Sequence, residues 1–422
     1  MIWHGYLLGG TGSNVYTRSL ARAWQLLGHD VTVVSQEPRP ELFDLGGAAT
    51  VRPDIGDVLP VFVMDRYEGV AARRLPDLSV AQREEFVRRN ASALRRVPAD
   101  FVLANHVLLG APVGAASGLP FAVKAHGSEL EFAMRGNADL CAWALDTLAG
   151  ARLVVAGSEH IRTVLDEVPG RGSYSHRVRV IPPGVDVEAL VPAERGPALT
   201  ALLAECRLDP PNPPDSHDER RPDAGNAERL AEFLDSDDPV VLYVGKLSAE
   251  KGVSLLLQAV SRLTARAVIV GFGPARAALA AQVRESGCVD RVLFTGPLEH
   301  RHLRHLWPVS RVGIVPSIFP EAFGMVAAEA ASCGCPPLVA RHSGLAEIAD
   351  GLSAEYPERY RHLTGFRSGD VDDLTARLGE LLALRPPEWA RLSAAARRAV
   401  QANWGWQRVA GKILAGMAGS DN

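Results

Sequence analysis

Short runs of apolar residues alternate with segments of helical periodicity along most of the chain. A short apolar run bounded by turns is typical of a buried strand, and apolar residues three or four positions apart indicate a helix. Because strand and helix alternate, the pattern predicts parallel sheets covered on both faces. In the first half, the expected strands are Ile2–Leu7, Val31–Val34, Phe101–Ala104, Phe121–Ala125 and Leu153–Ala156.

The same alternation restarts near residue 240, which predicts a second domain of the same α/β kind. The chain therefore reads as two doubly wound domains, at 1–190 and 239–403. The expected strands of the second are Val240–Val244, Ala267–Val270, Val292–Thr295, Val312–Val315 and Leu338–Ala340. The expected helices include Val253–Leu263, Asp373–Leu384, Trp389–Asn403 and a final helix at Trp404–Met417.

The join between the two patterns, residues 191–238, is rich in proline and charge. Such a composition buries little apolar surface, so we expect an insertion and linker that does not order firmly. Short helices are expected within it at Ala198–Cys206 and Ala227–Leu234. A surface excursion without function is favoured over a functional role for this segment.

Composition narrows the class of protein. The 422 residues are too many for one ordinary core, and 47% hydrophobic with 22% charged residues is globular composition. A formal net charge of −4 does not suggest a nucleic-acid binder. No apolar run approaches the ~18 residues of a membrane span, and the first residues lack the charged start, apolar stretch and cleavage site expected of a secretory signal. The 5 cysteines include no Cys-x-x-Cys pair, which favours a reducing cytoplasm over a disulfide framework.

Three arginine pairs raise the question of contact with an anionic lipid surface. Glu84 and Glu85 interrupt these charges, so a solvated helix face is favoured over peripheral membrane contact. The pairs are Arg73-Arg74, Arg88-Arg89 and Arg95-Arg96.

The clearest candidate site follows the expected strand Val312–Val315. Residues 320–329, Pro-Glu-Ala-Phe-Gly-Met-Val-Ala-Ala-Glu, open a helix whose N-terminal N–H groups and dipole would attract an anion. Glu321 and Glu329 could accept hydrogen bonds from hydroxyls on different parts of one long ligand. Glu329 is surrounded by alanines, and a carboxylate in such a place needs a partner. The N–H groups that could cradle a phosphate are those of Phe323, Gly324 and Met325.

Three further loops follow expected strands. Lys246 and Lys251 could both reach a diphosphate and neutralise a leaving group without a metal. His126 lies at the carboxyl edge of a strand, where α/β sheets usually bind ligands, although a lone histidine after a strand is more often structural. The turn Gly9-Gly10-Thr11-Gly12 could hold phosphate, with Ser13 as the N-cap of the next helix. It is not a dinucleotide fingerprint, because Val15 stands where the third glycine is needed.

Taken in order, these motifs resemble those of the retaining glycosyltransferases of family 4, which have the GT-B fold of two Rossmann-like domains facing across a cleft. Lys246 departs from the usual arginine of the family, and lysine lacks the planar fork of a guanidinium. The resembling motifs are Gly9-Gly10, His126-Gly127, Ser158-Glu159, Ile181–Asp186, residues 245–252 (the lysine loop, with Lys246 and Lys251), Gly271-Phe272-Gly273, Glu321 with Glu329, and Gly344 with Glu347.

The resemblance implies a role for each candidate residue. Lys246 and Lys251 would bind the donor diphosphate, Glu329 the ribose hydroxyls and Glu321 the donor sugar. His126, Lys251 and Glu321 would form the catalytic set. The other implied donor contacts are the amides of Phe323, Gly324, Met325 and Val326 with sugar and phosphate, the backbone of Leu298 with the base, Gly10 with the diphosphate, and His126 with the sugar.

The resemblance also implies an activity: transfer of a hexosyl group from a UDP- or GDP-linked sugar to a small-molecule, glycan or lipid-linked acceptor. No cofactor and no metal are expected, and the final helix is expected to cross back to the first domain. Three alternatives stay open on the same frame. They are a nucleotide-sugar epimerase, a glycoside phosphorylase and a non-catalytic sugar-nucleotide-binding protein.

Overall fold

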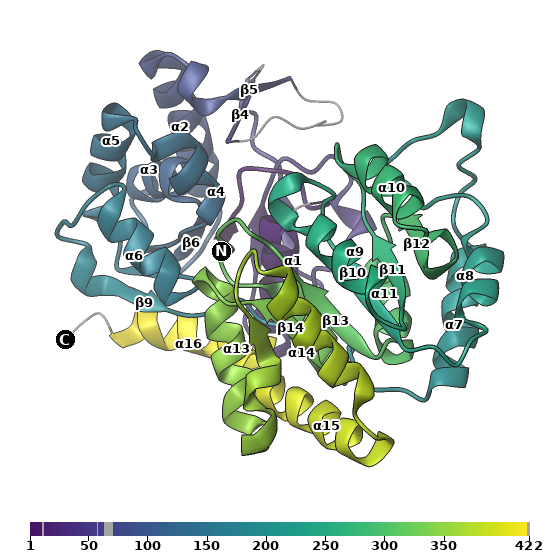
Figure 1. Ribbon diagram of the computed structural model, residues 1–422. Coiled ribbons are helices and arrows are strands. Elements are labelled where there is room, and N and C mark those ends of the chain that lie inside the picture. The colour runs from purple at the N-terminus through teal and green to yellow at the C-terminus, as the bar shows by residue number, and fades with distance from the viewer. Residues whose placement is uncertain (11, 57, 63–70, 420–422) are drawn as a thin grey trace. The chain divides into compact units, whose positions relative to one another are not determined.

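The computed structural model describes residues 1–419 of the chain except residues 11, 57 and 63–70 (Figure 1). The chain divides into two compact units. The first comprises Met1–Gly184 together with the chain from Trp406 onward, and the second comprises Val185–Gly405. Each unit is built on a parallel sheet, so the expectation of two doubly wound α/β domains is confirmed.

The sheet of the first unit has the strand order β3-β2-β1-β6-β7-β8-β9, and all neighbouring strands are parallel. The first strand is shorter than expected, because the chain bends at Gly5, where a Cβ would lie 2.7 Å from the Trp3 ring. The strands are β1 (Ile2–Trp3), β2 (Thr32–Val34), β3 (Ala49–Val51), β6 (Val102–Asn105), β7 (Phe121–Lys124), β8 (Leu153–Ala156) and β9 (Val178–Val180), with β4 (Leu59–Val61) and β5 (Ala72–Arg74) as a separate pair.

Helices connect these strands, and the last helix of the chain belongs to the same unit. Its residue Ile413 is fully buried in the apolar cluster that contains Leu20, and Ala410 O accepts a hydrogen bond from Trp24 Nε1 at 3.2 Å. The first helix begins at Gly12, so Ser13 lies in its first turn and is not the N-cap expected from the sequence. The helices are α1 (Gly12–Leu26), α2 (Val80–Leu94), α3 (Val107–Ser117), α4 (Gly127–Glu129), α5 (Ala138–Leu148), α6 (Glu159–Glu167) and α16 (Trp406–Ala418).

The sheet of the second unit has the order β12-β11-β10-β13-β14-β15, again with parallel neighbours. Its first strand pairs in register with the second, from Val240 opposite Arg266 to Val244 opposite Val270. The strands are β10 (Val240–Val244), β11 (Arg266–Val270), β12 (Val292–Gly296), β13 (Val312–Val315), β14 (Pro337–Ala340) and β15 (Gly365–Phe366). The helices are α7 (Arg195–Arg207), α8 (Asn226–Leu234), α9 (Val253–Ser261), α10 (Arg276–Glu285), α11 (His300–Val309), α12 (Met325–Ser332), α13 (Ser343–Glu355), α14 (Val371–Ala383) and α15 (Pro386–Asn403).

Both sheets reverse their strand order at one point, next to the strand that comes first in the chain. In the first unit this point lies between β1 and β6, and in the second between β10 and β13. Ligands of open α/β sheets bind outside the carboxyl ends of the strands at such a switch point. A ligand site is therefore expected at this edge of each sheet.

The expectation of a poorly ordered insertion at 191–238 was wrong. This segment belongs to the second unit, where α7 packs against both α8 and α11 (Figure 1). The physical reason is the spacing of its few apolar residues, because Ala198, Leu202 and Cys206 lie four positions apart and form one buried helix face. The boundary between the units falls at Gly184–Val185, before the residue 190 expected from the sequence.

None of the helices in the described part of the chain is both long enough and apolar enough to cross a lipid bilayer.

We predict that α7 is an integral part of the second unit's core. Leu202 is fully buried, so Leu202→Ala should lower the free energy of unfolding by about 2–5 kcal/mol through lost contacts and a cavity. Leu208 is 74% exposed, and Leu208→Ala serves as the matched control, with an expected change within about 0.5 kcal/mol. Urea unfolding followed by circular dichroism measures both. Equal midpoints for the two variants would contradict this assignment.

Candidate active site

The switch point of the second unit brings together loops that follow β10 and β13. Lys246 and Lys251 lie after β10, and Glu321 lies after β13. Lys251 Nζ forms an ion pair with Glu321 Oε1, although the two residues are far apart in sequence. Tyr243, at the end of β10, donates its hydroxyl hydrogen to Lys246 O at 2.9 Å. Burial, aided by the charge of Glu321, raises the pKa of Tyr243, so this phenol stays a donor.

These loops touch through their backbones, at positions occupied by glycine. A Cβ on Gly252 would clash with Pro316 O, and one on Gly271 would clash with Gly245 O. Both glycines also have positive φ angles, of 67° and 141°. Leu247 N–H donates to Phe272 O at 2.8 Å, which extends the same contact to the loop after β11. The lysine loop is thus held on both sides.

The loop that carries Glu321 is fastened to the start of α13. Glu321 N–H donates to Ser343 Oγ at 2.9 Å, and Gly344 N–H donates to Glu321 O at 3.0 Å. A Cβ on Gly344 would lie 2.6 Å from the Phe323 Cα, so only glycine allows this approach. After the loop, α12 begins beyond Gly324, whose φ is 114°. The predicted amides of Phe323, Gly324, Met325 and Val326 therefore occupy the entrance of a helix, which suits an anion.

Glu329 lies deeper in α12 and is 7% exposed. The partner that this carboxylate needs is His300, whose Nε2 lies 3.3 Å from Glu329 Oε1. His300 begins α11, directly after the loop in which Leu298 is buried. Glu329 thus contacts a histidine that lies two residues after Leu298 in the chain and that was not predicted from the sequence.

The two remaining predicted residues belong to the first unit. Gly10 is exposed and has a φ of 92°, while its neighbour Thr11 lies outside the described residues. His126 follows β7, and its Nε2 lies 3.0 Å from Asn105 Oδ1. Asn105 donates its own amide hydrogens to Thr17 Oγ1 and Trp3 O, so its oxygen accepts a hydrogen from the imidazole. His126 therefore has a fixed ring orientation and carries its proton on Nε2.

A buried polar cluster surrounds His126, and sequence reasoning missed it. His106 has a φ of 72°, and its ring lies between those of His4 and His126, with centroids 6.2 and 4.4 Å away. Glu129 Oε1 accepts from His126 N–H and Glu129 Oε2 from Leu108 N–H, both at 3.0 Å. The only signal in the sequence is position, because His4, His106 and Glu129 lie just beyond the carboxyl ends of β1, β6 and β7, respectively.

Burial governs the charges in this cluster. It lowers the pKa of His4 to about 4 and the pKa values of His106 and His126 well below their usual value. Burial also raises the pKa of Glu129 to about 7 and lowers the pKa of Lys124 to about 7. The three imidazoles are therefore neutral at pH 7, so His126 can take part in hydrogen bonding without adding a positive charge.

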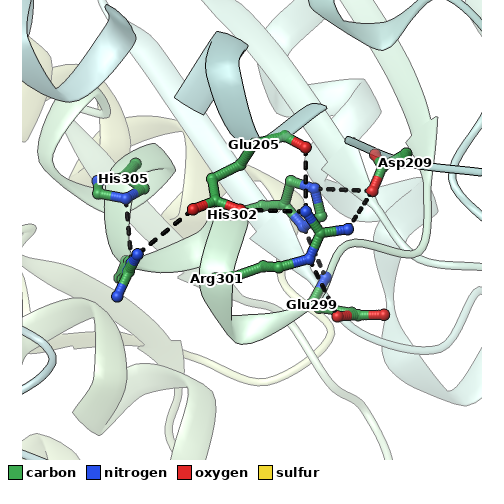
Figure 2. Close-up of polar contacts among 7 residues, drawn as sticks. Glu205, Asp209, Glu299, Arg301, His302 and His305 are labelled. Carbon is green, nitrogen blue, oxygen red and sulfur yellow. Dashed lines mark hydrogen bonds and ion pairs between the residues drawn. The ribbon is translucent and has the colours of Figure 1, made fainter. Parts of the chain in front are cut away.

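One group of potential metal ligands occurs in the described part of the chain, formed by Cys206, Asp209 and His302. His302 Nε2 lies 3.1 Å from Asp209 Oδ1, and Arg301 binds the same carboxylate (Figure 2). His302 Nδ1 accepts from Glu299 N–H at 3.2 Å, so the neutral ring carries its proton on Nε2. A metal needs a lone pair at that nitrogen, and the arrangement therefore favours an ion-pair network joining α7 to α11.

Comparison with protein families gives two matches. Residues 10–189 match the model "Glycosyltransferase Family 4", and residues 226–398 match "Glycosyl transferases group 1". Curated relatives include a D-inositol 3-phosphate glycosyltransferase of Xylanimonas cellulosilytica, 32% identical over 58% of this chain and 51% of that protein. The enzyme of the same name from Mycobacterium tuberculosis is 32% identical over 63% of this chain and 48% of its own. This chain thus spans about half the length of these relatives.

Solved structures share the fold over nearly the whole chain. HepE of Anabaena, in complex with UDP and glucose, has a TM-score of 0.70 at 17% identity, with 99% of each chain covered. A sucrose-phosphate synthase of Thermosynechococcus elongatus has a TM-score of 0.68 at 21% identity, covering 98% of this chain and 96% of that one. At such identities the likeness speaks for the fold alone.

We predict that this cluster of three histidines makes the protein acid-sensitive. The folded pKa values of His4, His106 and His126 lie below the unfolded value, so the unfolded state binds more protons as the pH falls below about 6.5. Glu129 acts in the opposite sense, because its raised pKa lets the folded state bind a proton between about pH 7 and about pH 4.5. Three histidines outweigh one carboxyl, so the free energy of unfolding should fall between about pH 6.5 and about pH 5.

The measurement is urea unfolding at several pH values in this window. His106→Asn should reduce the slope of the unfolding free energy against pH, by up to about 1.4 kcal/mol per pH unit, because one titrating group is lost. Asparagine suits this position because it tolerates a positive φ. His29 is exposed, and His29→Asn should leave the slope as it is in the parent protein. A slope that His106→Asn does not change would refute the assignment.

Proposed function

Because this chain belongs to glycosyltransferase family 4 and has the GT-B fold, we propose that it transfers a hexosyl group from a nucleoside-diphosphate sugar to an acceptor hydroxyl. One observation carries the proposal. At the switch point of the second unit's sheet, the loop with two lysines meets the loop that carries Glu321 and leads into α12, the helix that holds Glu329. This combination suits a ligand with an anionic centre flanked by two groups that bear hydroxyls.

Each residue has a proposed part in holding the donor. Lys246, Lys251 and the N-terminus of α12 bind the diphosphate, since all three offer positive potential. Glu329 accepts hydrogen bonds from the ribose hydroxyls and keeps its orientation through His300. Glu321 faces the donor sugar. Its ion pair with Lys251 means that one cation touches both the sugar-binding carboxylate and the phosphate site.

The proposed reaction breaks the bond between the anomeric carbon and the diphosphate oxygen. The acceptor oxygen bonds to the same face of that carbon, and its proton passes to the departing diphosphate oxygen, so configuration is retained. Negative charge grows on the diphosphate as the bond lengthens, and Lys251 stabilises it without a metal ion. Gly10 and His126 enter by family resemblance, as contacts to the diphosphate and the sugar. The neutral imidazole of His126 would not compete with the lysines for the anion.

The comparisons suggest which substrates to test first. HepE has been solved with UDP and with UDP-glucose, which makes uridine nucleotides the first donors, with GDP sugars next. The names of the curated relatives make a phosphorylated cyclitol the first acceptor. Glycans and lipid-linked sugars follow in the screen.

We predict acceptor-dependent release of nucleoside diphosphate from a UDP- or GDP-hexose, unchanged by EDTA, with the product's anomeric configuration equal to that of the donor by NMR. Each alternative activity has a different signature. An epimerase alters the donor without acceptor, a phosphorylase requires inorganic phosphate, and a binding protein releases nothing. Loss of activity in EDTA with recovery on adding a divalent cation would contradict the metal-free step.

We predict that Glu329→Ala weakens donor binding, because the ribose hydroxyls lose their acceptor inside a mostly buried site. The expected loss is about 1–3 kcal/mol, roughly 5- to 150-fold in the dissociation constant, measured by calorimetry with the nucleoside diphosphate. Glu285→Ala, at an exposed glutamate at the end of α10, should bind like the parent protein. Unchanged affinity in folded Glu329→Ala protein would remove Glu329 from the site.

A further inference from the structure

The two family matches leave residues 190–225 between them, and the later part of this stretch contacts the sheet edge that carries the proposed donor site. We call residues 209–225 the crossing segment. It contacts the loops at the carboxyl ends of β11 and β12, as the hydrogen bonds and ring contact described next establish. A surface excursion without function, as expected from composition, would have no reason to end there.

The start of the crossing segment is fixed to α11. Asp209 binds the guanidinium of Arg301 and lies 3.1 Å from His302 Nε2 (Figure 2). Glu205, in the last turn of α7, adds a second carboxylate to Arg301 at 3.1 Å. Since α11 begins at His300, this network sets the crossing segment against the helix that carries the partner of Glu329.

The far end of the crossing segment is fixed to the carboxyl end of β12. Asp223 N–H donates to Thr295 O at 2.8 Å, and its carboxylate binds Arg276 at the start of α10. A Cβ on Gly296 would lie 2.8 Å from Asp223 Oδ1, so the approach is close. Asn226 Nδ2 also donates to Thr295 O, at 2.9 Å. The crossing segment is therefore held on the strand that leads into the Leu298 loop.

A buried side chain keeps the middle of the crossing segment in shape. Asn212 Nδ2 donates to Asp218 O and Pro222 O, each at 3.0 Å, and Asn212 Oδ1 accepts from Asp218 N–H at 2.8 Å. This arrangement presents Arg220, whose guanidinium carbon lies 5.6 Å from the centroid of the Phe272 ring. The backbone of Phe272 is joined to the lysine loop, since Phe272 O accepts a hydrogen bond from Leu247 N–H.

From these contacts we propose that the crossing segment forms the wall beside the nucleotide base of the donor, and that Arg220, backed by Phe272, contacts that base and selects it. This inference rests on the proposed function. The lysines and Glu321 lie at the β10–β13 switch point, whereas the crossing segment covers β11 and β12 on one side of it. Neighbouring strands are about 4.8 Å apart, so the wall stands one to two strands from the phosphates, toward Leu298. A guanidinium plane suits this place, because it can stack on a base and donate to its carbonyl groups.

The test compares nucleoside diphosphates that differ only in their base. Calorimetry gives dissociation constants for UDP, GDP and ADP, and competition gives that of inorganic pyrophosphate. The parent protein should prefer one base. Arg220→Ala should raise the dissociation constant of that nucleotide by about fivefold or more and so reduce the difference between the bases, while the dissociation constant of pyrophosphate stays unchanged. Phe272→Leu should act in the same direction. Arg207 is an exposed arginine of α7, and Arg207→Ala should match the parent protein.

The other outcomes separate this inference from the proposed function. If the parent protein binds none of the three nucleotides, both fall together. If it binds them and Arg220→Ala changes neither the affinity nor the preference for one base, the assignment of the crossing segment to the base is wrong, while the proposed donor site is not affected. If Arg220→Ala weakens the binding of nucleotide and of pyrophosphate equally, Arg220 is a phosphate ligand and its assignment to the base is overturned.

Discussion

Direct contact between loop backbones holds the switch point of the second unit together. Gly252 and Gly271 lie where any side chain would strike a carbonyl oxygen of a neighbouring loop. Backbone against backbone leaves little freedom, so the loops after β10, β11 and β13 keep a common geometry. Lys251 and Glu321 are side chains on that rigid base, and their ion pair depends on it. Pre-positioning of this kind lowers the ordering cost of binding a charged ligand.

The two units use opposite electrostatic means at their switch points. The second presents partly exposed charges, which solvent can stabilise until an anion arrives. The first buries His4 and His106 fully and His126 in part, and the loss of contact with water keeps these rings neutral. Glu129 and Lys124 lie in the same interior, where burial disfavours the charged form of both groups and each partly offsets this for the other. A rigid polar lining results in one unit, and a partly exposed set of lysines and carboxylates in the other.

Sequence reasoning predicted most of the sheet and part of the site. The bounds of β8, β10 and β13 agree with the sequence because each is a fully apolar run between turns. Lys251 and Glu321 could be selected because each follows such a run. His106 and Lys124 could not, since an isolated polar residue at a strand end gives no periodic signal and its partners come from other strands. Within residues 191–238 the two short helices were predicted, but their firm packing was not, because prolines dominate the composition while Ala198, Leu202 and Cys206 form one buried face.

The place of α16 has a consequence for biosynthesis. Its residues Val409 and Ile413 complete an apolar cluster with the first helix of the chain, so this part of the first unit lacks a wall until α16 has left the ribosome. The second unit is continuous in sequence and is synthesised in full before then. Domains generally fold in the order of their synthesis, and here that order is reversed for the final packing step. Until then Trp24 and Leu20 of the nascent first unit are not covered by α16, so an apolar surface that chaperones can bind is exposed during translation.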